Sequence, residues 1–177
     1  MKTTQILIAG FGGQGILFAG QFLAYKGLME DLQVSWLPSY GPEMRGGTAN
    51  CNVILSDTPV GSPIVTTPDV LIAMNLPSLQ KYISTVAPGG QVYVDSTLID
   101  AKVERTDVDV FYIPATQMAK DHGIATLANM IIVGCLLQNH PELDFAGAEQ
   151  TVEHLVPPKK AVLIELNMKA LNLGKEY

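Results

Sequence analysis

The length of 177 residues suits one domain, taken here as residues 1–177, with a sizeable core. Hydrophobic residues make up 47% of the chain and charged residues only 16%, which indicates that partner proteins cover part of the surface. The net charge of -6 argues against nucleic acid or an anionic membrane as a partner, because both attract basic surfaces.

No segment is typical of export or of membrane insertion. Residues 1–9 predict a short strand rather than a signal peptide, and the most apolar stretch, 127–137, is too short to span a membrane. The two cysteines, Cys51 and Cys135, lack the spacing of a metal or iron–sulfur site, so no metal is expected on this chain. Two free thiols indicate the cytoplasm.

Short apolar segments alternate with amphipathic ones, which predicts an α/β fold of three layers, α/β/α, around a mostly parallel sheet. A central buried strand is expected at 3–10, followed by a helix at about 13–26, where apolar residues recur every three or four positions. The next strand, at 33–38, should stop at Pro38. A glycine-rich loop at 39–48 then leads to a strand at 49–56, in which apolar and polar residues alternate.

The second half of the chain continues this alternation after a turn-rich stretch. Pro77 suits the first turn of a helix, a buried strand is expected at 69–74, and two more strands are expected at 91–95 and 109–114. Thr116 and Thr126 have the side chains of helix N-caps. The helix after Thr126 is apolar nearly all round and should be deeply buried, and two amphipathic helices close the chain.

A glycine-rich turn joins the first strand to the first helix. Gly10, Gly12 and Gly15 form G-x-G-x-x-G, completed by Gly13 and Gln14. Gly10 should permit a tight turn, Gly12 the approach of another molecule, and Gly15 close packing of the helix on the sheet. The free N–H groups at the helix start would attract an anion such as a phosphate.

The acid that a dinucleotide site places near the end of its second strand is missing, because residues 34–38 read Val-Ser-Trp-Leu-Pro. A free-standing NAD or FAD site is therefore not expected. Two interpretations of the turn stay open at this point: a close-packed turn that binds nothing, and a turn that holds the phosphate of a cofactor.

The loop at 39–48 is the second candidate segment. It carries Tyr40, Glu43 and Arg45, and its glycines, Gly46 and Gly47 among them, allow unusual backbone angles. A loop that leaves the carboxyl edge of a parallel sheet lies where ligands bind in such folds. Tyrosine and arginine are also enriched in interface cores. The alternative is a solvated loop with one Glu43–Arg45 ion pair.

Three segments together resemble the gamma subunit, or gamma domain, of the 2-oxoacid:ferredoxin oxidoreductases. They are GFGGQG at the first turn, SYGPEMRGGTANC in the second loop, and GSPIV followed by PDVLIAMN. The resemblance covers nearly the whole chain, with the blocks in the expected order. The versions SYGPEMRGGT and IAMNLPSL look most like the subunits of 2-oxoglutarate or branched-chain 2-oxoacid enzymes.

The resemblance implies a Rossmann-like domain inside an assembly that converts a 2-oxoacid, coenzyme A and oxidised ferredoxin to acyl-CoA, carbon dioxide and reduced ferredoxin. It implies thiamine-diphosphate-binding alpha and beta subunits and a ferredoxin-like delta subunit as partners. Thiamine diphosphate, magnesium and iron–sulfur clusters would then lie on those partners, because this sequence shows no motif for them, and coenzyme A would be a shared substrate.

The residues expected at the inter-subunit active-site edge come from both loops: Gly10, Gly12, Gly13, Gln14, Gly15, Tyr40, Glu43, Arg45, Gly46, Gly47 and Asn50. No catalytic residue is identified. Arg45 would fork onto a carboxylate or phosphate, or satisfy carbonyls of its own loop. Asp95 and the three histidines are expected to be structural. The competing functions are a pyruvate or indolepyruvate enzyme subunit, a free-standing nucleotide-binding protein and a pure scaffold.

Overall fold

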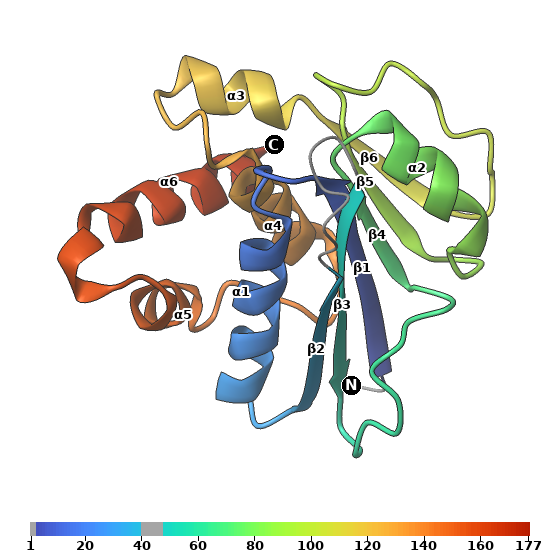
Figure 1. The fold of residues 1–177 in the computed structure, drawn as a ribbon, viewed down its shortest axis with the longest axis horizontal. Helices are drawn as coiled ribbons and strands as arrows, with labels where there is room; N and C mark the ends of the chain where they lie inside the picture. The colour runs from blue at the N-terminus through green and yellow to red at the C-terminus, as the bar shows by residue number, and fades with distance from the viewer. Residues whose placement is uncertain (1–2, 40–47) are drawn as a thin grey trace.

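The computed structural model describes residues 3–39 and 48–177, which form one six-stranded sheet covered by helices (Figure 1). The strands are β1 (Thr3–Phe11), β2 (Gln33–Ser39), β3 (Thr48–Ser56), β4 (Val70–Ala73), β5 (Gln91–Asp95) and β6 (Asp109–Ile113). The helices are α1 (Ile16–Met29), α2 (Leu76–Tyr82), α3 (Ala115–Asp121), α4 (Ala128–Asn139), α5 (Ala148–Leu155) and α6 (Val162–Glu176). Short 3-10 turns, η1 (Ile83–Thr85) and η2 (Pro158–Lys160), follow α2 and precede α6.

The strand order in the sheet is β2-β3-β1-β4-β5-β6. β1, β4, β5 and β6 pair in parallel, whereas β3 runs antiparallel to both of its neighbours, β1 and β2. Five strands therefore point in one direction, and the prediction of a mostly parallel sheet is confirmed. The central position predicted for the first strand is also confirmed, since β1 lies between β3 and β4.

Helices cover both faces of the sheet, although unevenly (Figure 1). Alternate residues of β1 serve opposite faces: Ile6 and Ile8 belong to the larger core, which includes residues of α1 and α4, and Leu7 belongs to a smaller core that includes Leu79 of α2. All ten residues from 128 to 137 are buried, which confirms the predicted deep burial of this helix.

α4 and α6 pack backbone against backbone. A Cβ atom added at Gly134 would overlap the backbone of Leu171, and one added at Gly174 would overlap the backbone of Ile131. The two glycines thus allow a helix crossing closer than any side chain permits. This crossing holds α6 onto the buried helix, so the end of the chain is part of the main core.

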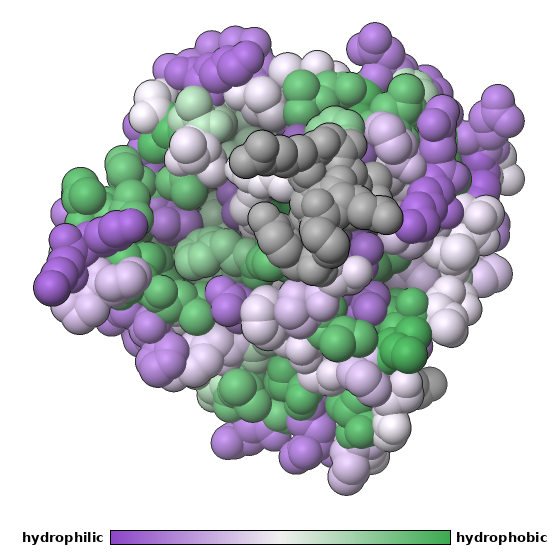
Figure 2. Space-filling view, in the orientation of Figure 1, coloured by the Kyte–Doolittle hydropathy of each residue, from purple (hydrophilic) through white to green (hydrophobic). Residues whose placement is uncertain are grey.

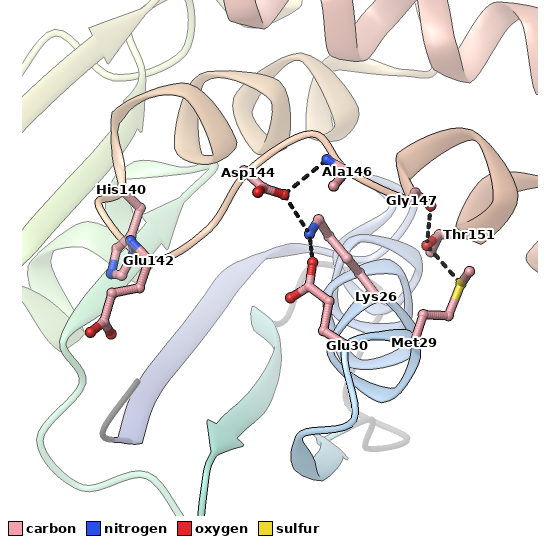
Figure 3. Close-up of polar contacts among 9 residues, drawn as sticks. All are labelled: Lys26, Met29, Glu30, His140, Glu142, Asp144, Ala146, Gly147 and Thr151. Atoms are coloured by element: carbon pink, nitrogen blue, oxygen red, sulfur yellow. Dashed lines mark hydrogen bonds and ion pairs between the residues drawn. The ribbon is translucent and has the colours of Figure 1, made fainter.

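A buried lysine ties α1 to the segment before α5 (Figure 3). Lys26 is 2% exposed; its ammonium group donates to Glu30 one turn later and to Oδ1 of Asp144 at 3.3 Å. The same Asp144 oxygen accepts from the backbone N–H of Ala146 at 2.8 Å, and these contacts hold the pKa of the Asp144 carboxyl below its usual value. Beside them, the hydroxyl of Thr151 contacts the sulfur of Met29 at 3.4 Å.

Some large apolar side chains stay exposed. Apolar surface gathers over the lower end of α1 (Figure 2), where Leu28 and Met29 are 55% and 45% exposed. A groove of about 290 Å³, lined mainly by apolar residues, lies close by, with Trp36 and Tyr25 among its walls. Among the described helices, none is both long enough and apolar enough to cross a membrane.

Two predicted element boundaries were wrong. The first helix starts at Ile16 rather than near residue 13, because Gly15 adopts the left-handed conformation of an N-cap. β2 continues through Pro38 to Ser39. As β2 is the outermost strand, a residue without an N–H group is tolerated there.

Neither threonine is an N-cap. Pro114 occupies that position of α3, and Leu127 that of α4. Thr116 lies inside the first turn of α3, where its hydroxyl donates to Oδ2 of the buried Asp95 at 2.5 Å. The carboxylate of Asp95 also accepts from the backbone N–H of Thr116 at 3.3 Å. A residue from β5 therefore supplies the acceptor that a local cap was expected to provide, and the structural role predicted for Asp95 is confirmed.

Candidate functional site at the carboxyl edge of the sheet

The glycine-rich turn after β1 lies at the edge where the parallel strands end, called here the carboxyl edge. β1 ends at Phe11, and Phe11 pairs directly with Thr48, the first residue of β3. The turn 12–15 after β1 therefore lies beside the point where the chain returns from the second loop. The antiparallel pairing of β3 with β1 produces this proximity, since it brings the start of one strand to the end of the other.

The predicted residues of the second loop, Tyr40, Glu43, Arg45, Gly46 and Gly47, lie outside the described residues. Asn50 of β3 is described. Its side chain donates to the hydroxyl of Tyr82 at 3.2 Å, at the end of α2. The next residue, Cys51, faces α1 instead. Asn50 thus lies near the carboxyl edge but on the α2 face of the sheet, and its side chain is engaged away from the α1 face.

The structure requires the glycines of the turn for reasons that differ from the predicted ones. Gly10 lies in β1 without an unusual φ, and a Cβ atom there would come within 2.6 Å of Oε1 of Gln14. Gly13 and Gly15 do need glycine, with φ of +91° and +73°. A Cβ at Gly15 would lie 2.5 Å from Nδ2 of Asn129, so the close approach at Gly15 is to α4 rather than to the sheet. Gly12 and Gly13 are exposed.

Asn129 is a member of this site that sequence reasoning missed. It lies in the first turn of α4, is 3% exposed, and donates from Nδ2 to the carbonyl of Gly15 at 3.0 Å. Its Oδ1 has no hydrogen-bond partner among the described residues. The available signal was its position, since it is the single polar side chain in the apolar run 127–137. A buried amide in such a run needs a specific partner.

The contact between Gly15 and Asn129 brings the N-termini of α1 and α4 together. Neither helix has a side-chain cap, and neither has an acidic residue in its first turn. The first N–H groups of each helix lack helical partners, and each helix dipole is positive at that end. Two such ends in contact produce a positive potential that favours an anion.

A further buried polar group lies at the same edge. Asn75 follows β4, is 2% exposed, and caps α2 by accepting from the N–H of Ser78 at 2.8 Å. The Nδ2 of Asn75 and the hydroxyl of Ser78 have no partner among the described residues. Unpaired buried polar groups cost free energy, so their presence at this edge is consistent with a molecule that approaches it.

Histidines and cysteines do not contribute to this edge. His122 and His140 end α3 and α4, and His154 stacks on Tyr25 with ring centroids 3.9 Å apart. Burial raises the pKa of the Cys51 thiol to about 12, which makes this group inert. Within residues 3–39 and 48–177, no three His, Cys, Asp or Glu side chains are grouped so that they could hold a metal ion.

These features define a Rossmann-like α/β domain whose glycine turn and two uncapped helix N-termini form an edge suited to an anionic group. The chain belongs to the pyruvate ferredoxin/flavodoxin oxidoreductase family, whose model matches residues 5–177.

The relatives of this chain include much longer proteins as well as proteins of similar length. The ketoisovalerate oxidoreductase subunit VorA of Methanothermobacter thermautotrophicus is 39% identical over 174 residues, 98% of this chain but 36% of the relative. This chain therefore spans about a third of that protein. In contrast, the gamma subunit of a keto/oxoacid ferredoxin oxidoreductase from Geobacter sulfurreducens superposes with a TM-score of 0.82 at 29% identity, covering 98% of this chain and 96% of that one.

A second solved structure carries ligands. It is the 2-oxoglutarate:ferredoxin oxidoreductase of Magnetococcus marinus with 2-oxoglutarate, coenzyme A and succinyl-CoA bound. It superposes with a TM-score of 0.85 at 25% identity, over 99% of this chain and 31% of that chain. The domain is thus a separate subunit in some relatives and one third of a longer chain in others.

Proposed function

We propose that this chain is the gamma subunit of a multi-subunit 2-oxoacid:ferredoxin oxidoreductase, which oxidatively decarboxylates a 2-oxoacid to acyl-CoA and carbon dioxide. Residues 1–177 would form its single domain, inactive when isolated. Membership of the family and the likeness to a gamma subunit of similar length support this proposal. Exposed apolar residues such as Leu28 and Met29 suit a surface that partner subunits cover.

The cofactors are assigned to the partners. In this proposal thiamine diphosphate with magnesium supplies the carbanion chemistry, and iron–sulfur clusters pass electrons to ferredoxin. Thiamine-diphosphate-binding alpha and beta subunits and a ferredoxin-like delta subunit would carry these groups. The described part of this chain offers no grouped cysteines or carboxylates that fit them. Its two buried free cysteines also suit the cytoplasmic location proposed for the assembly.

The role proposed for this chain is to hold the anionic part of coenzyme A at the carboxyl edge. The observation that carries it is the contact of two uncapped helix N-termini through Gly15 and Asn129. Phosphate groups bind well at such termini because the free N–H groups and both dipoles act on them together. The N–H groups of Gly12 and Gly13, both exposed residues, would extend the same surface. Arg45 would add a fork to a phosphate or carboxylate.

The substrate proposed first is 2-oxoglutarate, the oxoacid bound in the Magnetococcus marinus structure. A branched-chain 2-oxoacid is the second candidate, because the VorA relative is a ketoisovalerate oxidoreductase subunit. Purification of the native complex from its source, followed by ferredoxin reduction with 2-oxoglutarate, ketoisovalerate, pyruvate and indolepyruvate, distinguishes these substrates. If the proteins that copurify with this chain contain no thiamine diphosphate or no iron, the proposed function is contradicted.

A substitution in the turn tests the coenzyme A role. Gly12→Glu places a carboxylate at the positive edge and should raise the KM for coenzyme A by about tenfold or more, because it repels the anionic ligand. Gly61→Glu is the matched control, since Gly61 is exposed and has nothing within 4 Å of an added Cβ. An unchanged KM in a correctly assembled Gly12→Glu complex would remove coenzyme A from this edge.

A further inference from the structure

We propose that Gln14 is a positioning residue of the carboxyl edge: its side-chain amide fixes the backbone of the turn 11–15 and does not itself contact the ligand. The inference rests on the proposed function, in which this turn faces the anionic part of coenzyme A. It assigns two roles within the motif: the glycines present their N–H groups to the ligand, and the glutamine holds those groups in place.

The geometry of the amide carries the inference. Oε1 of Gln14 accepts from the backbone N–H of Phe11 at 2.6 Å, and Nε2 donates to the carbonyl of Met74 at 2.9 Å. Each end of the amide is thus bound to the backbone of a different strand end, since Phe11 closes β1 and Met74 follows β4. A side chain used in this way has its plane and direction fixed from within the chain.

Space for this amide is provided by a glycine. A Cβ atom at Gly10 would come within 2.6 Å of Oε1 of Gln14 and 2.7 Å of Cδ1 of Ile16. Gly10 has no unusual φ, so conformational freedom does not explain its presence. Gly10 and Gln14 therefore act together: Gly10 leaves the space that the side-chain amide of Gln14 occupies.

The side-chain amide of Gln14 bonds to a part of the turn that has few other contacts. Gly13 has a φ of +91° and no heavy atom within 4 Å of an added Cβ. The backbone hydrogen bond that closes the turn, from the N–H of Gln14 to the carbonyl of Phe11, is long at 3.3 Å. The side-chain bond to Phe11 reinforces this closure from the opposite direction. Its loss should let the N–H groups of Gly12 and Gly13 reorient.

A measurement on the full chain expressed alone tests the positioning directly. In Gln14→Met the N–H of Phe11 loses its acceptor, so its amide hydrogen should exchange faster, and the amide resonances of residues 12–15 should shift in NMR spectra. Gln21→Met is the control, because Gln21 is an exposed glutamine of α1, the helix that follows the turn. If Gln14→Met leaves Phe11 exchange and these resonances like those of the control, Gln14 does not position the turn.

A second measurement uses the assembled complex. Gln14→Met should raise the KM for coenzyme A by about five- to tenfold with little change in kcat, because the lost interaction affects binding in the ground state and the transition state equally. The fold must remain, so the thermal midpoint of each variant complex is measured alongside. A fall in kcat with an unchanged KM would contradict a positioning role in coenzyme A binding.

Gln14→Glu gives a pH signature that a merely structural role would not produce. A protonated carboxyl reproduces the amide, with an O–H that donates to Met74 and an oxygen that accepts from Phe11. The ionised carboxylate loses the donor and repels the anion. The KM ratio of Gln14→Glu to wild type should therefore fall as the pH is lowered from about 8 to about 5.5, whereas the ratio for Gln14→Met stays flat.

The outcomes separate this inference from the proposed function. If Gln14→Met alters the turn in the isolated chain while both Gln14→Met and Gly12→Glu leave the KM for coenzyme A unchanged, the coenzyme A role is overturned and the structural positioning stands. If Gly12→Glu raises the KM but no Gln14 variant does, the edge binds coenzyme A and the positioning inference is overturned. A Gln14→Glu ratio independent of pH also overturns it.

Discussion

At the scale of single residues, burial outweighs the helix dipole at His140. This residue ends α4, where the dipole favours a cation, yet burial lowers the pKa of its imidazole despite the opposing charges of Glu142 and Asp69. Its Nδ1 accepts from the backbone N–H of Glu142 at 3.3 Å, a contact that requires the unprotonated nitrogen. The folded protein therefore favours the neutral ring, although the helix dipole at this end favours a cation.

The neutral state of His140 sets the direction in which the stability of the fold changes with pH. The stability that neutral His140 contributes is fully present above the ordinary histidine pKa of about 6.5 and is lost as the pH falls below it, because the unfolded chain then binds more protons. Urea unfolding of wild type and His140→Gln at about pH 7.5 and about pH 5 checks this. The stability of wild type relative to the variant should decrease on acidification. An increase would mean that the folded protein holds a charged ring.

Residue roles were predictable where one local rule decides them. The sequence motif identified Gly15 as a glycine needed for close packing of the helix on the sheet, whereas its left-handed φ of +73° and its contact with Asn129 are what require it. It did not identify Asn129, 114 positions away, because that contact depends on how α4 packs against α1. The roles of Gly10 and Gln14 were missed for the same reason: each is set by the other and by Met74.

At the scale of elements, the buried ion pairs of Lys26 raise the question of whether they stabilise the fold or only satisfy a charge. Lys26 is 2% exposed, whereas the side chains of Glu30 and Asp144 are 34% and 73% exposed. Water can hydrate both carboxylates but not the ammonium group. Removing the lysine should therefore cost much less than removing its partners.

Two variants test this asymmetry. Lys26→Met keeps the aliphatic volume and should change the free energy of unfolding by no more than about 1 kcal/mol. The double variant Glu30→Gln with Asp144→Asn leaves an uncompensated buried ammonium group and should cost about 3 kcal/mol. Asp107→Asn, in the exposed Arg105–Asp107 pair, is the control and should have little effect. Greater destabilisation by Lys26→Met would show that the lysine charge itself stabilises the fold.

Elements were predicted well where their burial is uniform, as for β1 and α4, because a continuous apolar run does not depend on partners. The direction of β3 was not predicted. Its alternation was visible in the sequence, with Ala49, Cys51 and Val53 buried and Asn50 and Asn52 half-buried, and such alternation is typical of antiparallel strands. Helix starts were also misplaced: Asp95 supplies the acceptor that Thr116 was expected to supply at α3, and the left-handed Gly15 delays the start of α1 to Ile16.

At the scale of the whole molecule, the reversed strand explains why the dinucleotide acid is missing. In a dinucleotide-binding Rossmann fold, the strand beside the first one is parallel to it, and its carboxyl end carries the acid that holds the ribose. Here the neighbour of β1 on that side is the antiparallel β3, and the residue beside Phe11 is Thr48, where that strand begins. β2 ends at the carboxyl edge but is separated from β1 by the full width of β3.

The isolated chain should therefore not bind NAD or FAD, although it has a G-x-G-x-x-G turn. Glycine N–H groups and two helix termini can attract a phosphate, but the described strand next to β1 on the β2 side, β3, begins at this edge instead of ending there, so it offers no carboxyl end from which an acid could hold a ribose. Titration with NAD, NADP and FAD, followed by NMR of the amides of residues 10–15, should give no saturable shift up to about 1 mM. Saturable NAD binding abolished by Gly12→Glu would instead identify a self-sufficient nucleotide-binding protein. Shifts that wild type and Gly12→Glu share would mark a contact elsewhere on the chain.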